Sequence, residues 1–207
     1  MCTGDSASAG HSSRRASLPL RIKLGYSLFI AVLVPVYWHH YGPANFLWGS
    51  DIALFLVLLS LWSAKPLPNS MMAISVLPFE IAWIVDFASG SQLFGMSAYM
   101  FEPQRPLYLR ALSLFHVLLP VIIVFLLRRL GYDTRALRAQ TLLTWVVLPA
   151  TYLLTDPADN INRVFGLGDE PQQLVHPPVY LAAQMIVLPV VVYWPCHRLM
   201  RRLFKPG

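Results

Sequence analysis

The chain has 207 residues, of which 56% are hydrophobic and 13% are charged, against roughly 25% charged residues in an ordinary soluble domain. Its net charge of +6 comes from basic residues at the ends of apolar segments, not from a patch interleaved with aromatic residues, so no nucleic acid is expected as a partner. Two cysteines, Cys2 and Cys196, are too few for a disulfide framework or a metal cage made of thiolates.

Six apolar segments of about 18 to 22 residues follow one another with short polar connections between them. A helix of this length crosses the roughly 30 Å hydrocarbon core of a bilayer, because each residue adds about 1.5 Å. We therefore expect an all-α fold, a polytopic helical transmembrane bundle surrounded by the lipid bilayer. The expected spans are Leu24–Tyr41, Asn45–Ser63, Ser70–Ser89, Leu107–Leu127, Ala136–Thr155 and Val179–Leu199. Residues 23–207 then form a single transmembrane domain, and residues 1–22 form a flexible basic N-terminal tail.

Lysine and arginine residues are distributed unequally between the two expected faces of the membrane. If the N-terminus is cytoplasmic, only Arg105, Arg110 and Arg163 of the 16 basic residues lie outside, and the other thirteen lie inside. An excess of this kind marks the cytoplasmic face. We therefore expect both termini to be cytoplasmic.

The stretch Y-W-H-H-Y-G-P-A-N-F-L-W-G-S-D, positions 37 to 51, joins the first expected span to the second at the outer face. Its Gly-Pro pair predicts a tight reversal, after which Asn45 can cap the next helix through its side-chain oxygen. Asp51 is expected about 9 Å into the second span, where an unpaired carboxylate is costly and a functional role is the better interpretation. For His39, His40 and Trp48 the alternative is a wetted aromatic belt at the headgroup level.

Further polar residues are expected in the outer half or the middle of the third and fourth spans. Glu80 and Asp86 lie in L-P-F-E-I-A-W-I-V-D-F, and Arg110 and His116 lie in Y-L-R-A-L-S-L-F-H-V-L-L-P. With the carboxylate of the second span, they predict a shared polar cavity open to the outside. On a straight helix the two acidic residues differ by about 120° in direction, so both face the cavity only if it is wide or if Pro78 bends the helix.

Two outer loops lie next to such a cavity. Residues 90–106 are apolar enough to lie along the interface, as a lid or as a simple connector. Residues 155–178 begin with T-D-P-A-D-N, in which Asp156 before Pro157 predicts a helix start. A cation site formed by Asp159 and Asn160 is the alternative for this loop.

The sequence has no H-E-x-x-H, G-x-S-x-G, phosphate-loop or C-x-x-C motif. A zinc or iron site would need His39, His40 and His116 to converge in three dimensions. Adjacent histidines on a helix point about 100° apart, so at most one of the first two is expected to bind a metal. No other cofactor is indicated.

Five runs between positions 37 and 170 are distinctive: Y-G-P-A-N-F-L-W-G-S-D-I-A-L-F, L-P-F-E-I-A-W-I-V-D-F, L-F-G-M-S-A-Y-M-F, L-S-L-F-H-V-L-L-P and T-D-P-A-D-N-I-N-R-V-F-G. In these runs the chain resembles an uncharacterised group of bacterial multi-pass membrane proteins described only as membrane-associated. The resemblance implies a multi-pass protein of the bacterial cytoplasmic (inner) membrane. It implies no activity.

The leading hypothesis is an outward-facing intramembrane site that binds, or chemically modifies, a lipid-like or amphiphilic molecule. Its acid, base or proton-shuttle candidates are Asp51, Glu80 and His116. Its ligand-contacting candidates are Asp86, Arg110, Asn45 and Trp48. Two alternatives stay open: a small proton-coupled transporter, and a structural or assembly protein in which Arg110 pairs with Asp86 or Asp51.

Overall fold

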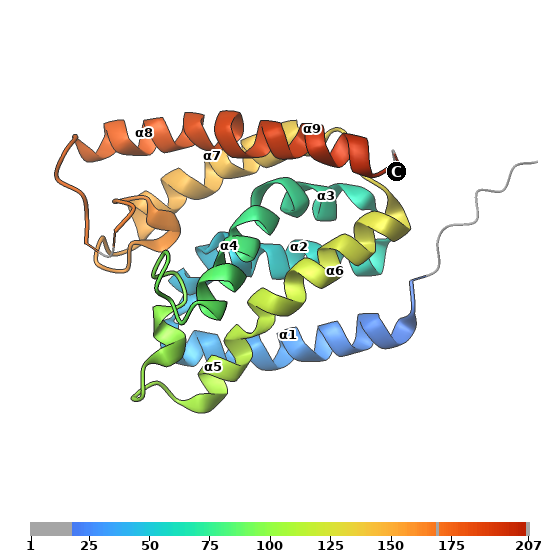
Figure 1. The fold of residues 1–207 in the computed structure, drawn as a ribbon, viewed down its shortest axis with the longest axis horizontal. Coiled ribbons are helices and arrows are strands. Elements are labelled where there is room, and N and C mark those ends of the chain that lie inside the picture. Colours follow the sequence, from blue (N-terminus) through green and yellow to red (C-terminus); the bar gives the residue numbers. More distant parts are fainter. Residues whose placement is uncertain (1–17, 169, 206–207) are drawn as a thin grey trace, which may run out of the picture.

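The computed structural model describes residues 18–168 and 170–205, and within them it contains helices and loops but no β-strand (Figure 1). The elements are α1 (Leu20–Tyr41), η1 (Pro43–Leu47), α2 (Gly49–Ser63), α3 (Pro66–Ser75), α4 (Leu77–Ala88), η2 (Ala98–Phe101), α5 (Leu107–Ser113), α6 (Phe115–Leu130), α7 (Ala136–Leu154), η3 (Ile161–Arg163), α8 (Pro177–Val187), the π-helical turn η4 (Leu188–Tyr193) and α9 (Trp194–Leu203). Helix α1 begins at Leu20, so it includes the last residues that the sequence assigned to the tail. Residues 1–17 of the predicted tail lie outside the described part of the chain.

The all-α class is confirmed, and each predicted span contains helix at its predicted place. Among the described residues, three helices are long and apolar enough to cross a membrane: α1, the run Leu107–Leu130 and the run Pro177–Leu203. The bent pair α3–α4 adds a fourth if it counts as one span, while α2 is apolar but shorter. Length and hydropathy therefore support three or four of the six predicted spans.

The helix that carries Glu80 is broken where Pro78 predicts a bend. Helices α3 and α4 meet at Val76 with an angle of 50° between them. Pro78 has no N–H group, so the carbonyl of Ile74 loses its partner in a continuous helix. Glu80 consequently lies in the first turn of a separate helix, α4.

Helix α3 lies at the centre of the bundle and contacts α2, α4, α6, α7 and α9. Its Ala73 and Ile74 are fully buried, as are Val57 of α2 and Ile123 of α6. Helices α1 and α8–α9 lie on opposite sides of the molecule and expose apolar side chains to the surroundings (Figure 1). Apolar exteriors of this extent indicate association with a membrane.

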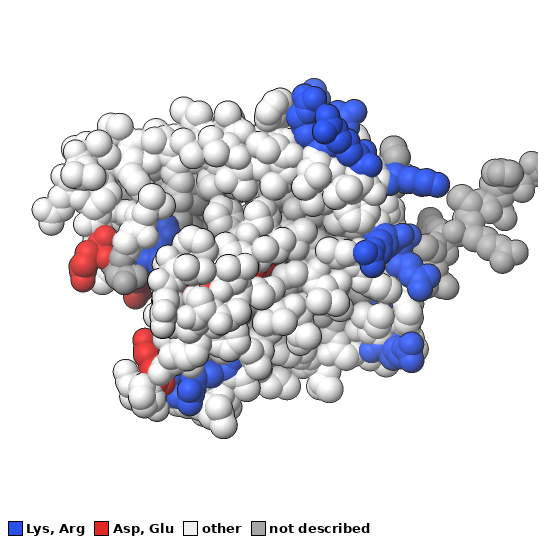
Figure 2. Space-filling model, viewed as in Figure 1, with Lys and Arg blue, Asp and Glu red and all other residues white. Residues whose placement is uncertain are grey.

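Basic residues gather at one end of the bundle. Figure 2 shows lysine and arginine side chains where α1 begins and where α6 and α9 end, and mixed charges at the opposite end. The second end carries η1, η2 and the loop after α7. The charge asymmetry expected from the sequence thus corresponds to the two ends of the folded bundle.

The loop between α6 and α7 binds α3 and α9 at the basic end. The backbone N–H of Asp133 donates to Ser70 Oγ on α3 at 3.0 Å, and the Tyr132 hydroxyl lies 2.7 Å from His197 Nδ1 on α9. The carboxylate of Asp133 accepts a hydrogen bond from the Arg135 guanidinium at 2.7 Å. This guanidinium holds the pKa of Asp133 below its usual range.

Replacing Asp133 with asparagine is expected to lower the melting temperature at pH 7, because the charged acceptor for Arg135 is lost. A carboxylate whose pKa falls on folding stabilises the folded state above its unfolded pKa of about 3.9, and this contribution is lost as the pH falls through the lowered value. The difference in melting temperature between wild type and Asp133→Asn should therefore shrink below about pH 4. Thermal unfolding in detergent at a series of pH values measures it, with the exposed Asp159→Asn as control. A difference that does not change with pH contradicts the prediction.

Candidate functional site

A cavity of about 770 Å³ lies in the half of the bundle opposite the basic end. Its wall is formed by α1, α2, the bend between α3 and α4, α6, α7, α8 and parts of the outer loops, and most lining side chains are apolar or aromatic. Figure 2 shows this side of the molecule hollowed below α8, with small areas of acidic side chain visible inside. The volume lies within the roughly 300 to 1,000 Å³ of small-molecule sites.

Five of the residues singled out from the sequence line this cavity: Asn45, Trp48, Asp51, Glu80 and His116. They come from η1, α2, α4 and α6, which are far apart in the chain. The expected convergence of polar residues from neighbouring spans is therefore present for this group. Asp86, Arg110, His39 and His40 are not among the residues that line it.

Glu80 and His116 form a carboxyl–imidazole pair in the cavity wall. Glu80 Oε2 lies 2.7 Å from His116 Nδ1, and the side chain of Glu80 is only 3% exposed. The imidazole stacks against Trp83 with 4.7 Å between ring centroids, which fixes its plane. A pair of this geometry can hold one proton and transfer it between the two groups.

Asp51 lies in the first turn of α2, not deep within a span, because the helix begins at Gly49. The N-terminal end of a helix favours a negative charge. The predicted cap by Asn45 is wrong: Asn45 lies in η1, and its Nδ2 donates a long hydrogen bond of 3.4 Å to Asp51 Oδ2. Asp51 itself is 3% exposed, and its Oδ1 has no hydrogen-bond partner among the described residues.

The cap at the start of α2, predicted for Asn45, is supplied by Asn162, which was not predicted from the sequence. Its Oδ1 accepts a hydrogen bond from the backbone N–H of Gly49 at 2.9 Å, and its Nδ2 donates to the carbonyl of Leu47 at 2.7 Å. Its own carbonyl accepts from Gln184 Nε2 of α8 at 2.8 Å. One residue thus connects the start of α2 with α8 across the cavity mouth.

The loop after α7 also differs from its prediction. Asp156 Oδ1 accepts a hydrogen bond within a turn, not at a helix start, and α8 begins only at Pro177. Asn160 binds the loop's own backbone: Nδ2 donates to the carbonyls of Gly166 and Gly168, both at 2.9 Å, and Oδ1 accepts from Phe165. Asn160 and Asn162 both have positive φ, which asparagine tolerates better than most residues. In the sequence, the two asparagines in N-I-N are the feature that could have indicated this turn.

The far wall of the cavity carries polar residues of α7 and α8 that the sequence analysis did not single out. Gln140, Thr144 and Tyr193 form a chain, with Gln140 Nε2 donating to Thr144 Oγ1 at 3.2 Å and Thr144 Oγ1 lying 2.9 Å from the Tyr193 hydroxyl. Gln184 lies beside the cavity mouth. These residues do not belong to a recognisable sequence motif, and only the packing of α7 against α8 and η4 brings them to the site.

Asp86 has a structural position in place of the predicted ligand contact. It is fully buried, and its carboxylate accepts hydrogen bonds from the backbone N–H groups of Phe94 and Ser97 at 2.7 and 2.9 Å. The hydroxyls of Ser91 and Ser97 also donate to it. Asp86 therefore closes the loop that follows α4, and this loop in turn places Met96 and Tyr99 against the cavity.

Arg110 does not pair with either predicted carboxylate among the described residues. Its Nη1 donates to the carbonyl of Met100 at 3.3 Å. Together with Asp86, it shapes the outer loop of residues 89–106. The interhelical pairs proposed for a purely structural role, Arg110 with Asp86 or Asp51, are absent.

The histidines do not form a metal site. His40 Nε2 lies 2.7 Å from the Tyr108 hydroxyl, His39 and His40 are exposed neighbours on α1, and His116 is engaged by Glu80. Among the described residues no three His, Cys, Asp or Glu side chains are placed to hold an ion. The donor set for zinc or iron therefore does not fit.

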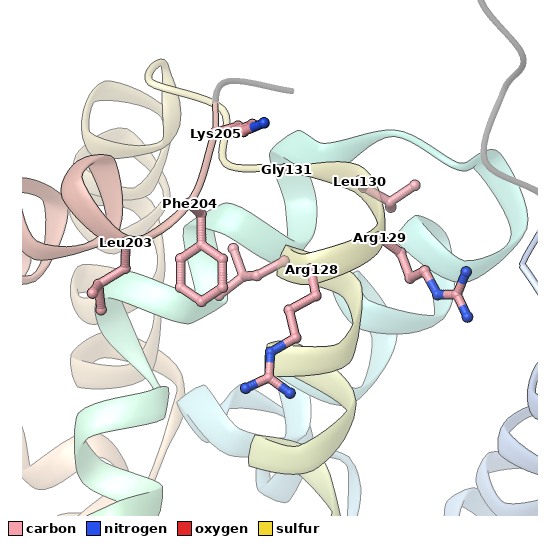
Figure 3. Close-up of a pocket in the computed structure, with 8 residues that line it drawn as sticks. Arg128, Arg129, Leu130, Gly131, Leu203, Phe204 and Lys205 are labelled. Atoms are coloured by element: carbon pink, nitrogen blue, oxygen red, sulfur yellow. The ribbon is translucent and has the colours of Figure 1, made fainter.

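A second hollow of about 650 Å³ lies at the basic end, where α6 and α9 finish. It is lined by Arg128, Arg129, Lys205 and apolar residues such as Phe204. Figure 3 shows that the two guanidinium groups point in different directions. Because its charged groups are exposed and do not converge, we take the larger cavity as the functional site.

Comparisons with family models, with curated proteins and with solved structures found no match to this chain.

Replacing Asn162 with alanine is expected to destabilise the protein by about 2 kcal/mol, because the N–H of Gly49 and the carbonyl of Leu47 lose their partners. The positive φ of 54° adds to the cost for alanine. Asn162→Gly removes the same hydrogen bonds without that backbone strain, so it should be less destabilised than Asn162→Ala but still less stable than wild type. Unfolding by a denaturing detergent, followed by circular dichroism, measures all three. Wild-type stability in the glycine variant would refute the role of the amide.

Proposed function

We propose that this chain is a six-span protein of a bacterial cytoplasmic membrane that binds a lipid-like or amphiphilic molecule from the outer face. The observation that supports this most is the cavity, which joins buried Asp51 and the Glu80–His116 pair to mostly apolar and aromatic walls. A molecule with both a polar end and a hydrocarbon part complements such a lining. In this proposal the Glu80–His116 pair is the group that an acid–base step on the ligand would use.

The orientation in the proposal follows from charge. The described lysines and arginines gather at the end opposite the cavity, apart from Arg105, Arg110 and Arg163. Basic loops mark the cytoplasmic side, so the cavity end faces outward. Both termini then lie in the cytoplasm, and α7 and the pair η1–α2 count as spans in addition to the three or four recognised by hydropathy.

The packing favours a binding site over a transport path. Toward the basic end the centre of the bundle is filled by fully buried side chains, including the apolar Leu61, Ile123 and Leu126. Ser60 and Ser70 are also buried there, and their hydroxyls bind backbone groups of the protein. Asn69 is buried there, but its Nδ2 is used by the carbonyl of Ile123 at 3.1 Å. A path for a polar solute to the inner face would need a polar lining at this level.

The topology predicts which positions are accessible from outside the cell. In a chain without its native cysteines, Gln104→Cys and Gln173→Cys should react with a membrane-impermeant maleimide on intact cells, because both exposed side chains lie in outer loops. Thr134→Cys, in the loop between α6 and α7, should react only after permeabilisation. Equal labelling of positions 134 and 173 would show that α7 does not cross the membrane and would contradict the six-span topology.

Occupancy of the cavity is tested with a photoactivatable fatty alcohol that carries a diazirine in its tail. The wild-type protein in nanodiscs should give one adduct per chain, located by mass spectrometry on lining residues. Ala183→Trp should abolish this adduct, because residue 183 lines the cavity and an indole occupies part of it. Ala182→Trp is the matched control, because Ala182 is an exposed residue next to Ala183 on the same helix and does not line the cavity. Equal labelling of both variants would rule the cavity out as the binding site.

A further inference from the structure

Several residues that line the cavity carry a buried polar atom without a hydrogen-bond partner among the described residues. The acceptors are Asp51 Oδ1, Gln140 Oε1 and Gln184 Oε1, and Trp83 Nε1 is a donor in the same state. The orientation of the Gln184 amide is fixed, because its Nε2 donates to the carbonyl of Asn162 at 2.8 Å. An acceptor buried without a donor is costly, so each of these oxygens needs a donor from outside the protein.

We propose that the amphiphile bound in this cavity carries a primary ammonium group at its polar end, and that this group binds Asp51. This inference rests on the proposed function and names the class of ligand. Asp51 is the acidic member of these three unmet acceptors, and its one described side-chain hydrogen bond, from Asn45, is long at 3.4 Å. A buried carboxyl group is stabilised either by protonation or by pairing with a cation, and an ammonium supplies both the charge and several N–H donors.

The cationic side chains of the lining are directed elsewhere. Arg105 binds Glu102 at 3.1 Å and donates to the Tyr41 hydroxyl at 2.8 Å. Arg163 Nη1 donates to the carbonyl of Gly168 at 2.8 Å. No ion pair joins Asp51 to a described basic residue. The positive charge that Asp51 needs is therefore assigned to the ligand.

The remaining wall of the cavity also favours a cation over an anion. Glu80 lies in the same lining beside Asp51, whereas the two lining arginines, Arg105 and Arg163, bind groups of the outer loops, so the acidic groups disfavour a phosphate or sulfate next to Asp51. Aromatic rings of Tyr37, Trp48 and Trp83 line the same space, and ring faces attract ammonium groups. The apolar part of the wall, including Phe79 and Leu188, is then available to the hydrocarbon chain.

The test compares ligands that share one tail and differ in the head: dodecylammonium, dodecyltrimethylammonium, dodecanol and dodecyl phosphate. Each competes with the diazirine fatty alcohol for the wild-type protein in nanodiscs at pH 7, with Ala183→Trp as background for partition into the lipid. Dodecylammonium should compete about tenfold more strongly than dodecanol, because a hydrogen bond between charged groups is stronger than one from a neutral hydroxyl. The trimethyl compound should be weaker than dodecylammonium because it has charge but no N–H donor.

Asp51→Asn should reduce the preference for dodecylammonium over dodecanol to within about threefold. Asp159→Asn, an exposed change of the same kind at the same end, should retain the full preference. The ligand series on the wild-type protein tests the inference even if Asp51→Asn does not fold. Equal competition by all four heads, or preference for dodecyl phosphate, overturns the ammonium assignment but leaves cavity binding intact. Absence of labelling in the wild type overturns both.

Discussion

Every break in a helix leaves backbone N–H and carbonyl groups that must find partners, and inside an apolar bundle water does not supply them. This constraint organises the cavity end of the molecule. Asp86 accepts the N–H groups of the loop after α4, Asn160 binds the loop after α7, and Asn162 serves the start of α2. Three short polar side chains therefore let the chain reverse direction repeatedly without exposing its backbone to hydrocarbon.

The same breaks create the space for the site. Because α4 departs from α3 by 50° at Val76, Glu80 and Trp83 face away from the packed centre around Ile74 and meet His116 of α6. A straight helix would continue the packing of α3 and leave less room between α4 and α7. The bend at Pro78 is thus a structural cause of the cavity, and the loops held by Asp86 and Asn162 cover its mouth.

The buried acidic residues differ in how completely their oxygens are used. Asp86 and Asp133 are surrounded by donors from their own loops, which explains their burial without any ligand. Glu80 is satisfied by His116. Asp51 is buried to a similar degree, but one of its oxygens has no donor in the described part of the chain. A carboxylate that the fold leaves unsatisfied is the strongest indication that the cavity binds something, because selection for stability alone would favour a neutral residue there.

Local sequence features are enough to predict the helical class, the positions of the apolar helices, the bend at Pro78 and a common polar region that includes Asp51, Glu80 and His116. Apolar block length, proline and distance along a helix are local quantities, so they can be read from one segment at a time. Counting residues gives the depth of a side chain but not its direction around the helix or its partners. For that reason Asp86 and Arg110 were assigned to the ligand although they organise a loop, and the cap of α2 was assigned to Asn45. The actual cap, Asn162, is separated from Gly49 by 113 positions, and only the packing of the loop after α7 against α2 brings them together.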